Sequence, residues 1–183
     1  MESYILPGIL ILAAAFFVYT YNRLVGLRNM ADTARANIDT LLQKRFDLVP
    51  NLVNTVKGYM AHEREVLENL TRARTAWLKA STLRDNAAAD QAGAGALKTL
   101  FAVAENYPEL KANQNFLLLQ EELSGLENKI AYGRQRYNRT VMAFNTAIMR
   151  FPTNLLANLF KFTRRDYFAL ETEQAREAIK VEV

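Results

Sequence analysis

The chain has 183 residues, no cysteine and a single histidine. The absence of cysteine excludes disulfides, thiolate nucleophiles and cysteine metal sites, and one histidine cannot build a multi-histidine metal site. The net charge is +4 with acids and bases interleaved. Because no compact basic stripe stands out, this excess favours contact with an anionic membrane surface over nucleic acid.

Residues 3–22 form an uncharged apolar stretch between Glu2 and Arg23. Twenty helical residues span about 30 Å, the thickness of a hydrocarbon core. A buried core helix is the alternative, but core helices are seldom apolar on every side for this length. No basic residue precedes the stretch and no cleavage site follows it, so we predict a retained transmembrane anchor and not a signal peptide. The residues assigned to the span are Ile5, Leu10, Leu12, Phe16, Phe17 and Tyr21.

Basic residues follow the apolar stretch closely, at Arg23, Arg28 and Arg35. The positive-inside bias therefore predicts that the N-terminus lies outside and the rest of the chain lies in the cytoplasm. Arg23 and Arg28 are also candidates for contact with lipid headgroups or with a partner.

The anchor is predicted to continue into a long helix. Apolar residues recur at steps of three and four from Leu24 to Leu41; Arg45 interrupts this series, which resumes from Leu48 to Val56. Pro50 predicts a kink without a sharp break. A helix break is expected within about three residues of Gly58, because glycine often follows the last turn of a helix.

Three more helices are expected. The second covers roughly residues 61–81, and residues 85–95, rich in Ala, Gly and Asn, predict a loop running into a weak helix start. The third ends near residue 106, before Tyr107-Pro108. The fourth covers residues 109–151, with apolar residues at steps of three or four from Phe116 to Phe151, and ends at Pro152.

No stretch alternates with the period of a strand, so the predicted fold class is all-α. We expect an N-terminal transmembrane helix continuing into an antiparallel up-and-down four-helix bundle with coiled-coil-like spacing. The expected domains are the anchor at 1–22, the helical bundle at 23–151, and an apolar and basic C-terminal segment with a charged tail at 152–183.

The segment after Pro152 has the composition of an interfacial segment, with apolar anchors and cations for anionic headgroups. Two alternatives are open: contact with lipid, or folding back onto the bundle. The candidate residues are Leu155, Leu156, Leu159, Phe160, Phe162, Arg164 and Arg165.

No catalytic motif is complete. His62-Glu63 begins like the HExxH motif of zinc proteases, but Val66 stands where the second histidine is required. Di-iron Glu-x-x-His pairs and glycine-rich phosphate loops are also missing. We therefore predict no catalytic, cofactor or metal site and no enzyme. The cations Arg134, Arg136 and Arg139 form either a solvated face or a partner site.

Four stretches are similar to the LemA family: YNRLVGLRN (21–29), IDTLLQKRFDLVPNLVNTVKGYMAHEREVLENLTRAR (38–74), LFAVAENYPELKANQNFLLLQEELSGLENKIAYGRQRYN (100–138) and FNTAIMRFPTNLLA (144–157). The chain departs from the family pattern at Leu126, where Thr is usual, and at Lys161, where Phe-Gly-Phe is usual. The resemblance implies a helical bundle on one membrane helix, with no established catalytic site. It also implies association with membrane proteases or a part in membrane organisation.

The leading hypothesis is a non-enzymatic, membrane-anchored scaffold or adaptor that acts through homo-oligomerisation. The alternative is a membrane-shaping or membrane-organising protein that acts directly on lipid. The expected partners are the lipid bilayer, further copies of the chain, and a membrane protease or other membrane protein. The expected location is the inner (cytoplasmic) membrane of a bacterium, with a single pass.

Overall fold

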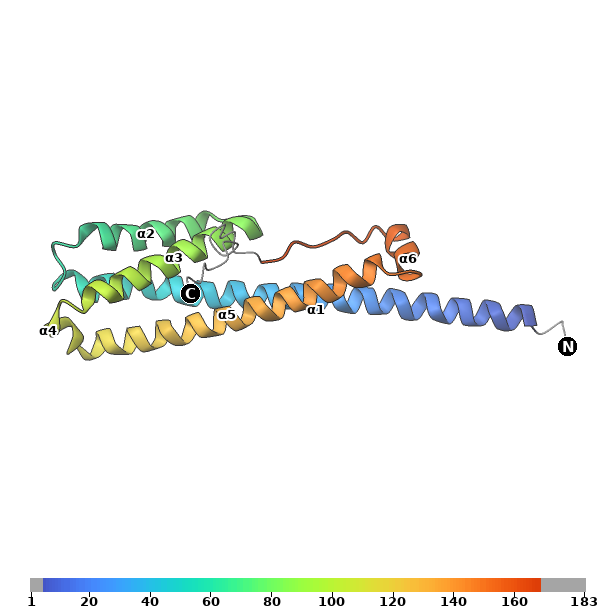
Figure 1. The fold of residues 1–183 in the computed structure, drawn as a ribbon, viewed down its shortest axis with the longest axis horizontal. Helices are drawn as coiled ribbons and strands as arrows, with labels where there is room; N and C mark the ends of the chain where they lie inside the picture. The colour runs from blue at the N-terminus through green and yellow to red at the C-terminus, as the bar shows by residue number, and fades with distance from the viewer. Residues whose placement is uncertain (1–4, 169–183) are drawn as a thin grey trace, which may run out of the picture. The chain divides into compact units, whose positions relative to one another are not determined.

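The computed structural model describes residues 5–168, and every regular element within them is a helix (Figure 1). The prediction of an all-α fold is confirmed. The helices are α1 (Ile5–Lys57), α2 (Arg64–Lys79), α3 (Leu83–Ala104), α4 (Pro108–Lys111), α5 (Gln114–Met149) and α6 (Thr153–Leu159).

Contacts divide the described chain into two compact units. Unit 1 comprises residues 5–41 and 128–167, and unit 2 comprises residues 42–127 with Phe168. Each of the long helices α1 and α5 is divided between the units, with one part in unit 1 and the other in unit 2.

Unit 2 is a four-helix bundle made of the second part of α1, α2, α3 and the first part of α5 (Figure 1). Its core is apolar, and the ring of Phe46 stacks on that of Trp77 with 5.2 Å between their centroids. Gly93 of α3 lies against Phe46, where any larger residue would meet the ring. The buried core residues are Phe46, Val49, Leu52, Val56, Met60, Leu70, Ala73, Leu97, Leu100, Ala104, Leu110, Phe116 and Leu123.

Unit 1 is built on the antiparallel pairing of the first part of α1 with the second part of α5, and α6 packs near the end of this pair. Its small apolar cluster joins all three helices and consists of Leu24, Phe144, Ala147, Ile148 and Ala157. The helix pair therefore fixes where α6 lies along α1.

The predicted loop at residues 85–95 is wrong, because α3 already begins at Leu83. Thr82 and Asp85 form a capping box: Asp85 N donates to Thr82 Oγ1 at 3.1 Å, and Thr82 N donates to Asp85 Oδ2 at 3.3 Å. The box satisfies two free N–H groups at the helix start, and the following alanines are the best helix formers.

The predicted fourth helix was too long at both ends. Pro108 starts the separate turn α4, and Asn113 Oδ1 accepts a hydrogen bond from Phe116 N at 3.1 Å, which caps the start of α5. At the other end α5 stops at Met149, and Phe151, placed by the sequence in the buried series, is 79% exposed.

The α1 helix runs from the apolar stretch through Pro50 and ends at Lys57, directly before Gly58. No glycine among residues 5–168 has a positive φ, so this helix end does not use a left-handed glycine. The predicted second helix is slightly shorter in the structure, from Arg64 to Lys79.

Candidate membrane-interface site

The first part of α1 is long and apolar enough to cross a membrane. Its most apolar window of 18 residues is only 6% buried, which distinguishes it from the core helix of a soluble domain. Every residue assigned to the span is exposed: Ile5, Leu10, Leu12, Phe16, Phe17 and Tyr21.

Helix α6 brings a second apolar surface beside the end of this stretch. The ring of Phe160 lies 5.7 Å from that of Phe17 and 4.7 Å from that of Tyr21, measured between centroids. Phe162 continues the contact, 6.2 Å from both Tyr21 and Phe144. The C-terminal segment is thus held against the last turns of the predicted span.

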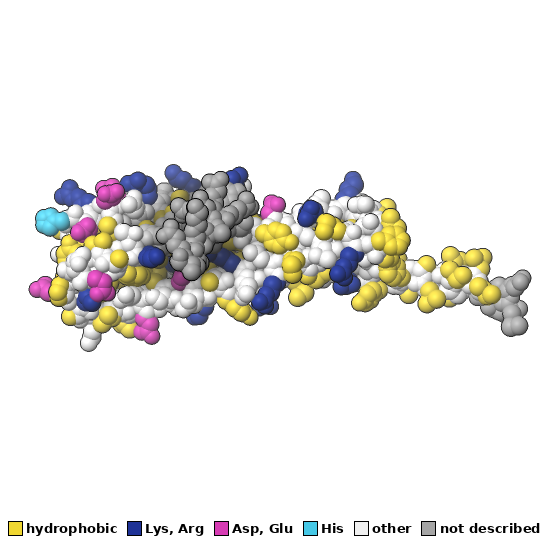
Figure 2. All heavy atoms as spheres, viewed as in Figure 1, with side chains coloured by type: hydrophobic (Ala, Val, Ile, Leu, Met, Phe, Trp, Pro, Cys, Tyr) yellow, Lys and Arg dark blue, Asp and Glu magenta, His cyan; other side chains and the backbone are white. Residues whose placement is uncertain are grey.

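The C-terminal candidates divide into an inner and an outer set. On the inner side, Leu156 is buried and Phe162 packs against the apolar cluster of unit 1. On the outer side, Leu155 and Leu159 are 60% and 66% exposed, and Phe160 is 42% exposed. The segment therefore folds back onto unit 1 and still presents an apolar outer surface. In Figure 2, hydrophobic side chains gather around this end of the α1–α5 pair.

Residues 161–167 form an extended strap along the α1–α5 pair, held by polar contacts. Asn145 Nδ2 donates to Arg165 O at 2.8 Å, and Arg165 N donates to Asn145 Oδ1 at 2.9 Å. Tyr137 Oη donates to Asp166 O at 2.9 Å. Burial raises the pKa of the Tyr137 hydroxyl, which keeps it protonated and able to donate.

The cations of the candidate set also differ in role. Arg165 forms a fork with Asp32, with Nη1 2.5 Å from Oδ1 and Nη2 3.0 Å from Oδ2, so it fastens the strap to α1. Arg164, Arg23 and Arg28 are exposed and remain candidates for an anionic surface. Gly58 lies in unit 2, outside this site.

The sequence interpretation missed a buried ionic cluster in unit 2. Arg45 is fully buried. Its Nη2 contacts the Asp90 carboxylate and donates to Asp90 O at 3.1 Å, and its Nη1 lies 2.5 Å from Glu127 Oε2. Desolvation lowers the Arg45 pKa, and Glu127 opposes that shift. The cluster joins α1, α3 and α5. The available signal was spacing, because Arg45 lies at helical steps from buried Leu42 and Val49.

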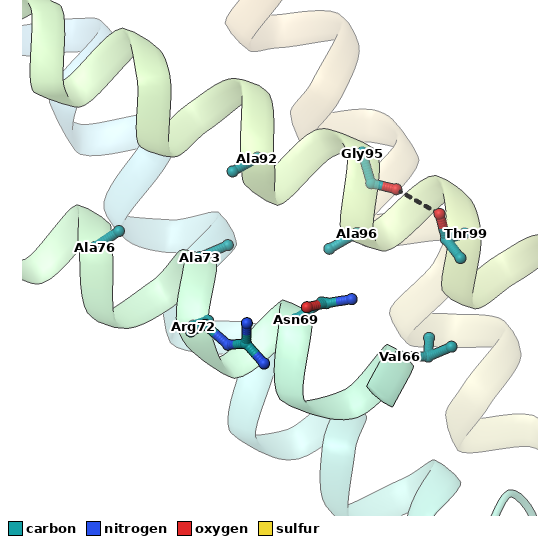
Figure 3. A pocket seen from close by; sticks show the side chains of 9 residues that line it. All are labelled: Val66, Asn69, Arg72, Ala73, Ala76, Ala92, Gly95, Ala96 and Thr99. Carbon is teal, nitrogen blue, oxygen red and sulfur yellow. Dashed lines mark hydrogen bonds between the residues drawn. The ribbon is translucent and has the colours of Figure 1, made fainter. Parts of the chain in front are cut away.

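The outer face of α2 and α3 carries a shallow groove of about 480 Å³ (Figure 3). Small side chains such as Ala73 and Ala92 form its floor, and Thr99 Oγ1 donates to Gly95 O at 3.1 Å. Arg72, the charged residue of its lining, pairs with Glu68 at 3.5 Å. Such a lining offers van der Waals contact and no acid–base pair. Across residues 5–168 there is also no group of His, Asp or Glu that could hold a metal ion.

A second groove, of about 460 Å³, lies in unit 1 between α1 and α5. Its floor includes Ala34 and Gly133, and Tyr132 stands 66% exposed beside them. Lys129 and Arg136, both exposed, give the groove a basic rim. The groove is therefore an apolar surface that favours an acidic neighbour.

Comparisons with known proteins give the family. The magnetosome protein MamQ of Magnetospirillum gryphiswaldense is 25% identical over 88% of this chain and 70% of its own length. The magnetosome protein MamQ 1 of Paramagnetospirillum magneticum is 26% identical over 86% and 69%. Protein LemA of Metamycoplasma hominis is 28% identical over 98% and 81%. None of these names denotes an enzyme. The model of the LemA family matches residues 34–183, and the chain therefore belongs to the LemA family.

Proposed function

We propose that the chain is a non-enzymatic, membrane-anchored scaffold or adaptor that works by assembling copies of itself. The observation that carries this proposal is the apolar, basic-rimmed groove between α1 and α5 of unit 1. A pair of helices that leaves an apolar floor uncovered on one side gains stability when a third helix packs there.

The occupant that we propose is α5 of a second copy, running antiparallel. Glu121 and Glu122 are exposed and precede the basic rim by about two turns of α5. An antiparallel pair with its two-fold axis midway between Glu122 and Lys129 places Glu122 of each copy opposite Lys129 of the other. The same patch then serves both copies, as a closed two-fold interface requires.

A charge exchange tests this arrangement. Lys129→Glu and Glu122→Lys should each lower the dimer fraction of the full chain in detergent, because each places like charges opposite one another. The double variant should restore the dimer. Lys98→Glu, at an exposed cation of α3, is the matched control. A monomeric wild type, or single variants that dimerise normally, would contradict the proposal.

The absence of cysteine allows a second measurement in native membranes. Gly125 lies next to the proposed axis, and nothing lies within 4 Å of an added Cβ there. Gly125→Cys should therefore form an intermolecular disulfide on mild oxidation. Leu78→Cys on α2, which is 57% exposed, should form no intermolecular disulfide under the same conditions.

The proposed location is the inner membrane of a bacterium, with the bundle in the cytoplasm, as the cations after the span favour. A reporter fused after Val183 should be active in its cytoplasmic form and inactive in a form that works only in the periplasm. A membrane protease or another membrane protein is a further candidate partner for a scaffold at this location.

Membrane shaping is the second candidate function. It is favoured by the one-sided apolar surface of α6 beside the span, because a wedge in one leaflet bends a bilayer. Purified full-length protein on liposomes should then produce tubules or rings without any partner. Liposomes of unchanged shape would contradict this function and leave the scaffold proposal untouched.

A further inference from the structure

The membrane-proximal surface of unit 1 combines exposed apolar side chains with unopposed positive charge. We call it the α6 face and define it by Phe151, Leu155, Leu159 and Phe160 together with Arg23, Arg28, Arg150, Lys161 and Arg164. We propose that the α6 face lies in the headgroup layer of the membrane and binds anionic phospholipids. This inference rests on α1 spanning the bilayer and is independent of self-assembly.

The position of the α6 face along α1 is set by aromatic contacts. Phe160 lies against Phe17 and Tyr21, which belong to the last turns of the uncharged stretch. When that stretch fills the hydrocarbon core, its last turns reach the boundary with the headgroups. Phe160 and the end of α6 therefore lie at the boundary between the hydrocarbon core and the headgroups.

The exposed apolar side chains of α6 lie on one side of the helix. Leu155 and Leu159 are one helical turn apart and share one side of α6, whereas Leu156 and Ala157 are buried on the other side. Phe151, just before α6, is 79% exposed. Water-soluble surfaces rarely carry such a contiguous patch, and here it continues the exposed apolar surface of the span. Lipid is the medium that covers both.

The charge of the same region has one sign. Residues 5–31 and 149–165 contain no Asp or Glu. Arg165 is held by Asp32, but the five cations of the α6 face are exposed. Each cation near an anionic bilayer strengthens binding by about fivefold. A purely protein-facing surface would need acidic groups from a partner at every one of these positions.

Lys161 offers an unusually clean test. Its φ of 56° lies in the left-handed region, and it is the one non-glycine residue of the described chain with a positive φ. Glycine adopts this conformation without steric strain. Lys161→Gly therefore removes a cation from the α6 face while the backbone keeps its path. Weaker binding of anionic lipid by this variant therefore reports the lost charge and not a changed backbone.

The experiment uses the full chain reconstituted in vesicles, with a fluorescent label on a cysteine introduced at Leu159. Vesicles of phosphatidylcholine, alone or mixed with phosphatidylglycerol, carry lipids with brominated acyl chains, which quench the label only on contact. A label at Ile11 is the positive control for the span. A label at Leu78 on α2 is the matched control for an exposed apolar position of unit 2, outside the α6 face.

We expect strong quenching at Leu159 in vesicles with phosphatidylglycerol, weaker quenching in pure phosphatidylcholine, and loss of the difference at high salt. Lys161→Gly combined with Arg164→Gln should clearly reduce the difference, because each cation removed weakens binding by about fivefold, whereas Lys98→Gln should keep it. Absence of quenching at Leu159, while Ile11 is quenched, would overturn the proposal. So would equal quenching in both lipids, which would show apolar contact without headgroup recognition. Dimer formation is measured separately, so failure here is distinct from failure of the scaffold proposal.

Discussion

Removal of Arg45 is expected to destabilise unit 2 more than most single changes. Arg45 and Asp90 are both fully buried, and the guanidinium contacts both the side chain and the carbonyl of Asp90. Glu127 is 45% exposed and can regain water. Arg45→Met keeps most of the volume but leaves the Asp90 carboxylate buried without the cation, which costs about 3–5 kcal/mol.

Replacing both buried charges should behave differently. Arg45→Met with Asp90→Leu removes the uncompensated charge and fills the space with apolar atoms, and such exchanges are often neutral or stabilising. We therefore expect the double variant to regain most of the stability lost in Arg45→Met. This non-additivity separates the ionic explanation from one based on packing alone.

Urea unfolding of the full chain in detergent measures both effects. The single tryptophan, Trp77, stacks on Phe46 and so reports on unit 2 directly. In a thermal melt, a loss of about 3 kcal/mol in a domain the size of unit 2 lowers its Tm by at least about 12 °C. A loss below about 1 kcal/mol in Arg45→Met, or no recovery in the double variant, would refute the reasoning.

Two further predictions concern α3. Gly93→Ala should cost about 1–3 kcal/mol, because the added Cβ would lie 2.9 Å from the Phe46 ring, whereas Gly95→Ala meets nothing within 4 Å and should be neutral or stabilising; denaturant curves of the pair compare them directly. Thr82→Ala should cost about 1 kcal/mol through loss of the capping box. Hydrogen bonding from Thr82 lowers the Asp85 pKa in the folded state, so the part of the stability that depends on the ionised Asp85 carboxylate is full above about pH 4 and is lost as the pH falls through the folded pKa. Asp85→Asn should make the unfolding free energy depend less on pH in this acidic range. An unchanged pH dependence would contradict the assignment.

The sequence predicted the long helices well because their apolar periodicity is long and regular. It failed where a polar residue occupies a core position. Arg45 was interpreted as a break in the buried series, although it keeps the helical spacing, because its partner Asp90 lies 45 positions away in a segment predicted as a loop. The spacing of Thr82 and Asp85 is a local signal for a helix start, which the interpretation from the alanine- and glycine-rich composition did not use.

The strap of unit 1 could not be predicted for a different reason. Asn145 and Tyr137 bind backbone atoms of residues 165 and 166, and a backbone partner leaves no trace in the sequence. The composition of the C-terminal segment indicated both apolar anchors and cations, but only the structure separates the inner residue Leu156 from the outer residues Leu155 and Leu159.

The two units differ in how completely they bury their own apolar side chains, and this difference points to where the chain meets its surroundings. Among the large hydrophobic residues that are exposed in residues 5–168, those of unit 2 are Tyr59, Leu78, Leu117 and Leu118, and all the others belong to unit 1. Unit 2 thus buries its own apolar side chains, and its buried ionic cluster joins α1, α3 and α5. Unit 1 exposes the candidate span, the outer side of α6 and the rim of a groove, and the apolar parts of these surfaces are removed from water when they contact lipid or another helix. Changes in the core of unit 2 should therefore act on stability, whereas the exposed apolar and basic positions of unit 1, with the acidic surface of α5 at Glu122, should act on membrane contact and assembly.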